Sequence, residues 1–163
     1  MTRHCVAALV LAGMCAAAAP ASAELITHKD LSLATALAIA TTAIDTCKSR
    51  GYSVSVTVVG REGQVILQLR GDGSNPHTME NSMRKAYTAR TTRAPSGNLS
   101  KRLKDDPSLS FIHLAHVIAA QGALPIKVGD ETIGGAGASG APGGEKDEAC
   151  IQAGLDKVAD QLK

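Results

Sequence analysis

Hydrophobic side chains recur at helical spacing near the beginning and near the end of the chain. One set of five residues is separated by four, three, four and three positions, which places its members on one face of a helix: Leu33, Leu37, Ala40, Ile44 and Cys47. Ser32 is suited to cap the start of this helix, and Gly51 is suited to end it. A second stripe predicts a final helix over about residues 144–162: Ile151, Leu155, Val158 and Leu162.

Alternating hydrophobic positions between these helices indicate strands. Residues 53–59 and 65–69 alternate on either side of a Gly-containing turn at 60–63, which predicts a hairpin. Residues 125–128 and 131–137 predict a second hairpin around Gly129 and Asp130.

A further helix is predicted between the two hairpins, from a cap at Thr78 to about Arg90. The apolar stretch 111–121 is compatible with a helix or a strand, and residues 98–104 with a short basic helix or turn. The order helix, hairpin, helix, hairpin, helix predicts an α/β (α+β) fold, with one mainly antiparallel sheet covered by helices.

The first 23 residues have the three regions of a secretory signal peptide. Arg3 lies in a short basic start, an Ala- and Leu-rich stretch follows, and residues 21–23 supply a small-x-small cleavage pattern. Cys15 allows a lipoprotein alternative, although the large Met14 precedes it. We therefore expect one domain over residues 24–163, exported to the periplasm or secreted, with no membrane insertion after the signal is removed.

Aromatic residues are scarce, which excludes several kinds of binding site. They make up 2% of the 163 residues, there is no Trp, and the formal net charge is only +2. Modules that bind single-stranded nucleic acid stack bases on aromatic rings, and nucleic-acid surfaces in general are strongly basic. We therefore expect no nucleic-acid partner.

Residues 135–140 match the glycine pattern G-x-G-x-x-G, but the context of a dinucleotide site is missing. Too few residues follow for the second parallel strand and the acidic residue that such a site needs. Two interpretations of this glycine-rich stretch remain open. It is a tight passage from strand to helix, or a backbone surface for anionic ligand groups at the start of the last helix.

Cys47 and Cys150 are the two cysteines beyond the signal peptide. Each lies on or beside the apolar stripe of a predicted helix, so they form a disulfide in an oxidising compartment or fill the core as two small hydrophobic residues. Their spacing does not suggest a zinc site.

Histidine and methionine supply the candidate ligands for a metal or cofactor. His77 lies where a loop enters the second predicted helix, and Met79, Met83 and Tyr87 follow it, so three types of iron ligand occur in one neighbourhood. His113 and His116 share a face only if their segment is helical. A methionine stripe at helical spacing is also a common way to fill a core.

Several segments together resemble the GlcG/HbpS-type haem-binding family, also called the haem-degrading domain family. The resemblance covers most of residues 31–162 and rests on the order and spacing of its motifs: 54–63, 70–74, 76–89, 124–126, 133–144 and 147–155. It departs from the family pattern at Arg61 and Glu62, and at His113 and His116.

This resemblance implies a profilin-like sandwich with a five-stranded antiparallel sheet, homo-oligomers that are often octamers, and haem as cofactor. It makes His77 the first choice for contact with the haem iron. His113 and His116 stay as alternatives from their spacing in the sequence, not from the resemblance. Candidates for the remaining haem contacts are Met79, Met83, Arg84, Lys85, Tyr87, Gly143 and Gly144.

The function expected from the resemblance is that of an exported haem-binding protein in haem handling, storage or sensing. The alternatives are an enzyme that degrades haem or acts on another small ligand, and an oligomeric adaptor for a small organic ligand. Because aromatic residues are scarce, we expect a porphyrin to be held by aliphatic and Met side chains, in a site that is shallow or completed by a neighbouring subunit.

Overall fold

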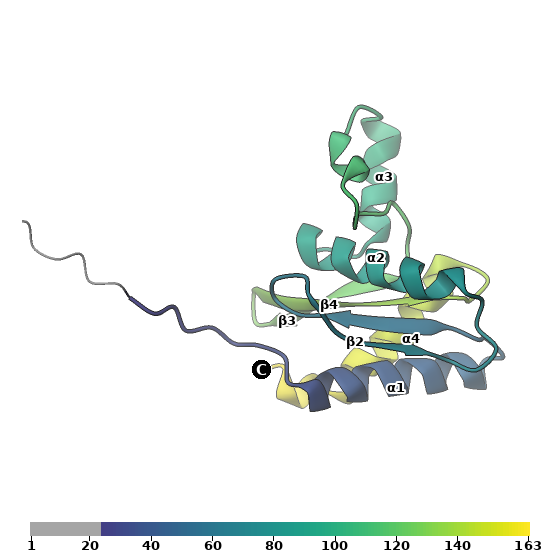
Figure 1. Cartoon of the computed structure of the whole chain (residues 1–163), viewed down its shortest axis with the longest axis horizontal. Helices are drawn as coiled ribbons and strands as arrows, with labels where there is room; N and C mark the ends of the chain where they lie inside the picture. The colour runs from purple at the N-terminus through teal and green to yellow at the C-terminus, as the bar shows by residue number, and fades with distance from the viewer. Residues whose placement is uncertain (1–23) are drawn as a thin grey trace, which may run out of the picture.

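The structure, a computed structural model, describes residues 24–163 and has one antiparallel sheet between two layers of helix (Figure 1). The predicted signal peptide at 1–23 lies outside the described residues. The elements are α1 (Leu33–Ser49), β1 (Ser55–Val59), β2 (Val65–Arg70), α2 (His77–Thr92), α3 (Gly97–Asp105), β3 (Ala123–Val128), β4 (Glu131–Ser139) and α4 (Gly144–Lys157), with short 3₁₀ turns at Ser110–His113 and Ala159–Gln161. The predicted α+β class is confirmed.

The sheet has four strands in the order β2-β1-β4-β3, and all neighbours are antiparallel. This is one strand fewer than the five that the family resemblance implied. The stretch 111–121, which was compatible with a strand, forms a 3₁₀ turn and loop in which only Val117 is fully buried. Central strand β1 is buried throughout, whereas edge strand β2 is partly exposed. Both predicted hairpins are present as β1–β2 and β3–β4.

Helices α1 and α4 cover one face of the sheet and pack closely against each other. Ser32 caps α1 as predicted, because its Oγ accepts a hydrogen bond from the Thr35 backbone N–H at 3.1 Å. The buried face of α1 is rotated from the predicted stripe, so that Leu33 and Leu37 are exposed. Close packing is the reason: at Gly154 of α4 an added Cβ would lie 2.4 Å from the Ile39 carbonyl oxygen of α1.

A disulfide joins these two helices. Cys47 in α1 and Cys150 in α4 are both fully buried, and their Cα atoms are 5.6 Å apart. This separation lies in the usual range for a disulfide. Of the two alternatives that the sequence left open, the structure has the bonded pair.

Helix α2 covers the other face of the sheet and approaches β4 at backbone distance (Figure 1). A Cβ at Gly135 would lie 2.4 Å from the Ala86 carbonyl oxygen, and one at Gly137 would lie 2.6 Å from that of Ser82. The glycine-rich stretch is therefore largely a strand, not a passage between elements, and its missing side chains make room for α2.

Buried hydroxyl groups join α2 to β1. The Thr57 and Ser82 hydroxyls are 2.8 Å apart, and those of Ser55 and Thr78 are 2.7 Å apart. Thr78 is therefore not the helix cap that the sequence predicted. The helix begins one residue earlier, at His77, and the Thr78 hydroxyl bonds the Asn75 carbonyl oxygen.

The segment from α3 through the 3₁₀ turn projects away from the sheet above α2 (Figure 1). Leu99 is its anchor in the core of the domain, with 2% of its surface exposed. Within residues 24–163, no helix has the length and apolar character needed to cross a bilayer.

Candidate functional site

A hollow lined mainly by polar residues lies between α2, β4 and the start of α4, and has a volume of about 370 Å³. His77, Asn81 and Lys85 of α2 line it at a spacing of four residues, which places them on one face of the helix. Ser139, Gly144 and Asp147 face them from β4 and α4. The hollow therefore contains His77, the candidate iron ligand, together with Lys85 and Gly144.

Lys85 and Asp147 form a buried ion pair at the base of this hollow. The Lys85 Nζ lies 2.8 Å from Asp147 Oδ2 and also donates to the Ala138 carbonyl oxygen at 3.1 Å. The other Asp147 oxygen accepts the Ala141 backbone N–H at 3.0 Å. The ammonium group of Lys85 is thus bonded to protein groups. Its first role is to link α2 to α4, and contact with a ligand is secondary.

A second, smaller hollow of about 230 Å³ adjoins the first at His77 and Asn81, and is completed by Glu80 and Arg84. Arg84 donates through Nη2 to the Val117 carbonyl oxygen at 2.8 Å, and its Nη1 lies 3.7 Å from Glu80. Its Nε is buried and has no hydrogen-bond partner among the described residues. The Arg84 Nε is therefore a donor without a partner, in the same hollow as the exposed His77 imidazole.

The structure does not bring all the predicted contacts to His77. Tyr87 is ten residues further along α2, about 15 Å away at 1.5 Å per residue, with its ring against Gly63. Met79 and Met83 are half-buried on the same stripe as Tyr87, on the β2 side of the helix, where Gln68 donates to the Met79 carbonyl oxygen at 2.7 Å. These three side chains therefore line neither hollow at His77.

The alternative histidines do not line the two hollows at His77. His113 is exposed at the end of its 3₁₀ turn, and His116 packs edge-to-face on Tyr87 with ring centroids 5.4 Å apart. In the part of the chain that the structure describes, no group of three His, Cys, Asp or Glu side chains is arranged to hold a metal ion.

Gly143 and Gly144 occupy the turn into α4. Gly143 has a φ of 139°, a backbone conformation that side chains disfavour, and is the N-cap of the helix. Gly144 packs against the Gln121 carbonyl oxygen, which would lie 2.5 Å from an added Cβ. Of the two glycines, Gly144 lines the hollow of His77.

Sequence reasoning missed Asn75, Asn81, Gln121, Ser139 and Asp147, which line the same hollow. The spacing of four between His77, Asn81 and Lys85 was a signal that could have placed Asn81 beside His77. Ser139 and Asp147 gave no comparable signal, because their positions depend on long-range contacts. The Asn81 amide, for example, donates to the Ser139 hydroxyl at 2.9 Å across 58 residues.

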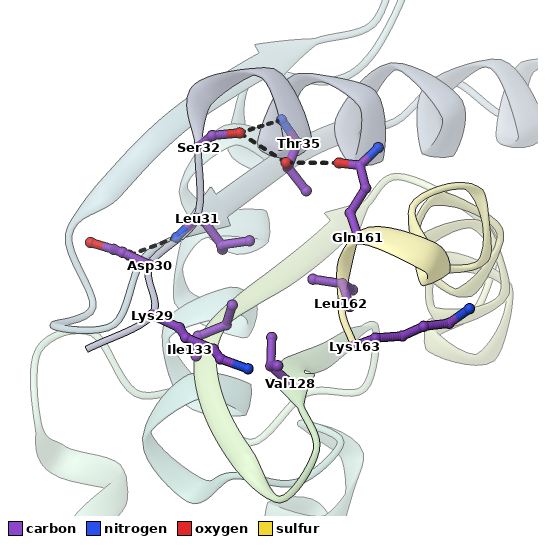
Figure 2. Close-up of a pocket in the computed structure, with 10 residues that line it drawn as sticks. All are labelled: Lys29, Asp30, Leu31, Ser32, Thr35, Val128, Ile133, Gln161, Leu162 and Lys163. Atoms are coloured by element: carbon purple, nitrogen blue, oxygen red, sulfur yellow. Dashed lines mark hydrogen bonds between the residues drawn. The ribbon is translucent and has the colours of Figure 1, made fainter. Parts of the chain in front are cut away.

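Another hollow, of about 260 Å³, lies between the segment that leads into α1 and the C-terminal residues (Figure 2). Its polar groups are bonded to one another: the Thr35 hydroxyl contacts the Ser32 hydroxyl at 2.8 Å and donates to the Gln161 side chain at 3.0 Å. Figure 2 shows Leu162 beside Gln161, with Val128 and Ile133 of the second hairpin nearby. The hydroxyl groups of Ser32 and Thr35 in this hollow are therefore already used in bonds within the protein.

The polar groups at His77 fit one edge of a haem, but the walls of a haem pocket are not present in one copy. The His77 imidazole is exposed, and the Nε of Arg84 is buried without a hydrogen-bond partner among the described residues. Imidazole is a common axial ligand of haem iron, and guanidinium groups bind carboxylates. The aliphatic residues of the larger hollow are only Ala120 and Ala141, which cover little of a porphyrin face.

The chain is similar to solved structures across nearly their whole length. It is 34% identical to a protein described as HbpS, covering 85% of this chain and 97% of that chain with a TM-score of 0.79. A double mutant of HbpS from Streptomyces reticuli is also 34% identical, with a TM-score of 0.78, covering 86% of this chain and 97% of that one. A PduOC structure, described as a complex with haem, shares the fold at 21% identity and a TM-score of 0.71, covering 78% of this chain and 94% of that chain.

No curated protein matches the chain. The model of the family described as haem degrading protein HbpS-like matches residues 31–156. This match takes in every strand, α1, α2 and α3, and nearly all of α4. The function of this protein is thus related to haem. The chain belongs to the family described as haem degrading protein HbpS-like.

Proposed function

We propose that this protein binds haem at the start of α2, with His77 as the iron ligand. The observation that carries the proposal is that an exposed imidazole and a guanidinium group whose Nε has no partner line one hollow, about two turns apart on the same helix. The haem complex described for PduOC, which shares this fold, supports haem as the ligand. Bound haem would supply an iron centre for ligand exchange or redox chemistry.

In this proposal the residues of α2 have separate roles. His77 provides a neutral nitrogen for the iron, and Arg84 holds a propionate by a charge-assisted hydrogen bond. Lys85 does not need to touch the ligand, because its ion pair with Asp147 fixes the wall of the hollow against α4. Met79, Met83 and Tyr87, on the other side of α2, are placed to contact only a large ligand that extends over the helix.

A second copy of the chain would cover the exposed face of the porphyrin. The hollow at His77 is lined mainly by polar side chains, so a haem bound by one copy leaves apolar surface in water. We propose a homo-oligomer for this reason, and an octamer is the size that the family resemblance favours. Haem affinity is then expected to fall when the protein is diluted below the concentration at which it assembles.

The proposed setting is the periplasm or the cell exterior, and the proposed role is haem handling, storage or sensing. The Cys47–Cys150 disulfide is consistent with such an oxidising compartment. Fusing the native residues 1–30 to a reporter that is active only after export tests this point. Loss of reporter activity on replacing residues 6–19 with polar residues is expected, and retained activity contradicts export by this segment.

Haemin titration of the purified protein tests haem binding. We expect a saturable Soret shift with a fixed haem-to-chain ratio, and its loss or displacement in H77A. The matched control is H113A, because His113 is also exposed but lies on the projecting segment. Unchanged spectra in H77A, with binding intact, would remove His77 as the ligand, and the absence of any saturable shift in the native protein would remove haem binding.

The same complex distinguishes binding from haem degradation. With a reductant and oxygen, an enzyme of the haem-degrading type is expected to lose the Soret band and release an open-chain tetrapyrrole. A binding or storage protein retains the band over the same period. Product analysis by absorbance and mass spectrometry separates the two outcomes.

A further inference from the structure

Three arginines surround a hollow at the far end of α2 from His77. Arg90 and Arg93 come from the end of α2, and Arg61 comes from the turn between β1 and β2. The hollow has a volume of about 220 Å³, and Tyr87 and Glu62 also line it. With three guanidinium groups and one carboxylate, its lining carries a formal charge of +2, which equals the net charge of the whole chain.

The side chain of Arg90 has bonding capacity that the protein does not use. Its Nε is buried and lacks a hydrogen-bond partner among the described residues. A buried donor without a partner costs about 1–3 kcal/mol, so such groups in a native fold call for an explanation. A ligand that accepts this hydrogen bond, once the side chain turns to present the donor to the hollow, would remove the cost.

Arg93 is held in an uncommon backbone conformation beside the same hollow. Its φ of 56° and ψ of 26° lie in the left-handed region, and among the described residues it is the non-glycine position with a positive φ. Gly or Asn is the usual choice at the end of a helix in this conformation. A long cationic side chain there is consistent with a role for its charge.

Arg61 is already engaged and supplies the fixed wall of the hollow. It forms an ion pair with Glu131 at 2.8 Å and donates to the Lys29 carbonyl oxygen at 2.6 Å. The Tyr87 ring is set against Gly63, where an added Cβ would lie 2.7 Å from its Cε2. Arg90 and Arg93 are therefore the donors whose side chains can adjust to a ligand, whereas Arg61 and Tyr87 are held in place by their contacts.

We propose that this hollow is a binding site for a small oxyanion, a phosphate or a carboxylate. The planar guanidinium group of Arg90 presents Nε–H and Nη–H donors side by side, which suits two oxygens of one anion. Arg93 adds a second positive charge. Glu62 opposes binding and favours a compact ligand that stays close to the arginines.

This site is separate from the proposed haem site and does not depend on it. Arg90 lies 13 residues beyond His77 on the same helix, about 20 Å at 1.5 Å per residue. A propionate of a haem whose iron is bound by His77 does not reach that far. Failure of haem binding would leave the oxyanion proposal intact, and the reverse also holds.

Isothermal titration of the full chain with sodium phosphate and with sodium succinate tests the proposal, against sodium chloride at equal ionic strength. We expect one saturable site for at least one of the two oxyanions, with affinity lowered about tenfold or more in R90Q. R93N removes the second charge with a residue that tolerates the left-handed conformation, and is expected to weaken binding without unfolding the protein. R50Q, on the opposite layer, is the control.

The two ligands distinguish the sources of the oxyanion. Binding of phosphate alone identifies a phosphate site, binding of succinate alone identifies a carboxylate site, and either supports the proposal. No saturable heat with either salt overturns it. Equal binding by the native protein, R90Q and R93N, with circular dichroism showing all three folded, also overturns it, because the anion then binds elsewhere.

Discussion

Lys85 Nζ and Asp147 Oδ2 lie 2.8 Å apart in the interior, and their side chains are only 5% and 3% exposed. The two residues are 62 positions apart in the sequence and connect helices on opposite faces of the sheet. Their pairing closes the base of the hollow at His77. The stability of the fold and the shape of the candidate site therefore depend on the same contact.

Removing one member of this pair is expected to destabilise the protein strongly. K85M leaves a buried carboxylate without its counter-ion, and D147N leaves a buried ammonium group in the same position, each at about 3–5 kcal/mol in the free energy of unfolding. Urea denaturation followed by circular dichroism measures the change. The double variant K85M/D147N removes both charges and is expected to be more stable than either single variant; single variants within about 1 kcal/mol of the native protein would contradict the coupling.

Reduction of the disulfide is expected to lower stability without changing the fold. The Cys47–Cys150 bond closes a loop with a sequence separation of 103, for which chain entropy gives a stabilisation of about 4–5 kcal/mol. Denaturation with and without reductant measures the loss. The C47S/C150S variant is the control, since its stability should match that of the reduced protein and should not respond to reductant.

A methyl group at Gly137 is expected to force α2 away from the sheet. The added Cβ would meet the Ser82 carbonyl oxygen at 2.6 Å and the Ala86 backbone nitrogen at 2.7 Å, and neither backbone atom can rotate aside. We expect G137A to destabilise the protein by about 1–3 kcal/mol. G129N is the matched control at an open position with a φ of 58°, where a change within about 0.5 kcal/mol is expected. Equal effects at the two glycines would show that the close packing of α2 has no energetic consequence.

Arg84 is expected to affect haem affinity more than stability. R84Q removes the proposed partner of a propionate, for which a loss of about tenfold in haem affinity is expected from a charge-assisted hydrogen bond. Loss of its bond to the Val117 carbonyl oxygen costs about 1 kcal/mol in stability. Haemin titration and urea denaturation of the same sample separate the two effects. R102Q, on the projecting segment, is the control and should bind haem like the native protein.

Local patterns in the sequence predicted much of the fold. The alternation of Val54, Val56 and Val58 depends on neighbours along one strand, and the cap at Ser32 depends on a residue three positions away, so both were readable. The rotation of α1, which exposes Leu33, was not readable because it follows from the approach of Gly154 on a distant helix.

The candidate site was readable only in part, for the same physical reason. His77 could be selected because its chemistry and its place at the start of a helix are local properties, whereas Arg84 was a candidate only through the family resemblance. Their roles in haem binding stay predictions. The engagement of Lys85 by Asp147, and the separation of Tyr87 from His77, are properties of the three-dimensional arrangement. The sequence presented Lys85 as a free cation because its partner lies on another helix.

The contact between α2 and the sheet gives the helix two independent sides. Its inner side is fixed by glycine and hydroxyl contacts to β4 and β1, which do not involve His77, Glu80 or Arg84. Substitutions on the outer side are therefore expected to leave the position of the helix unchanged. Ligand-binding residues on such a helix can be substituted without moving the helix. One fold can therefore acquire different ligand preferences through a few outward-facing residues.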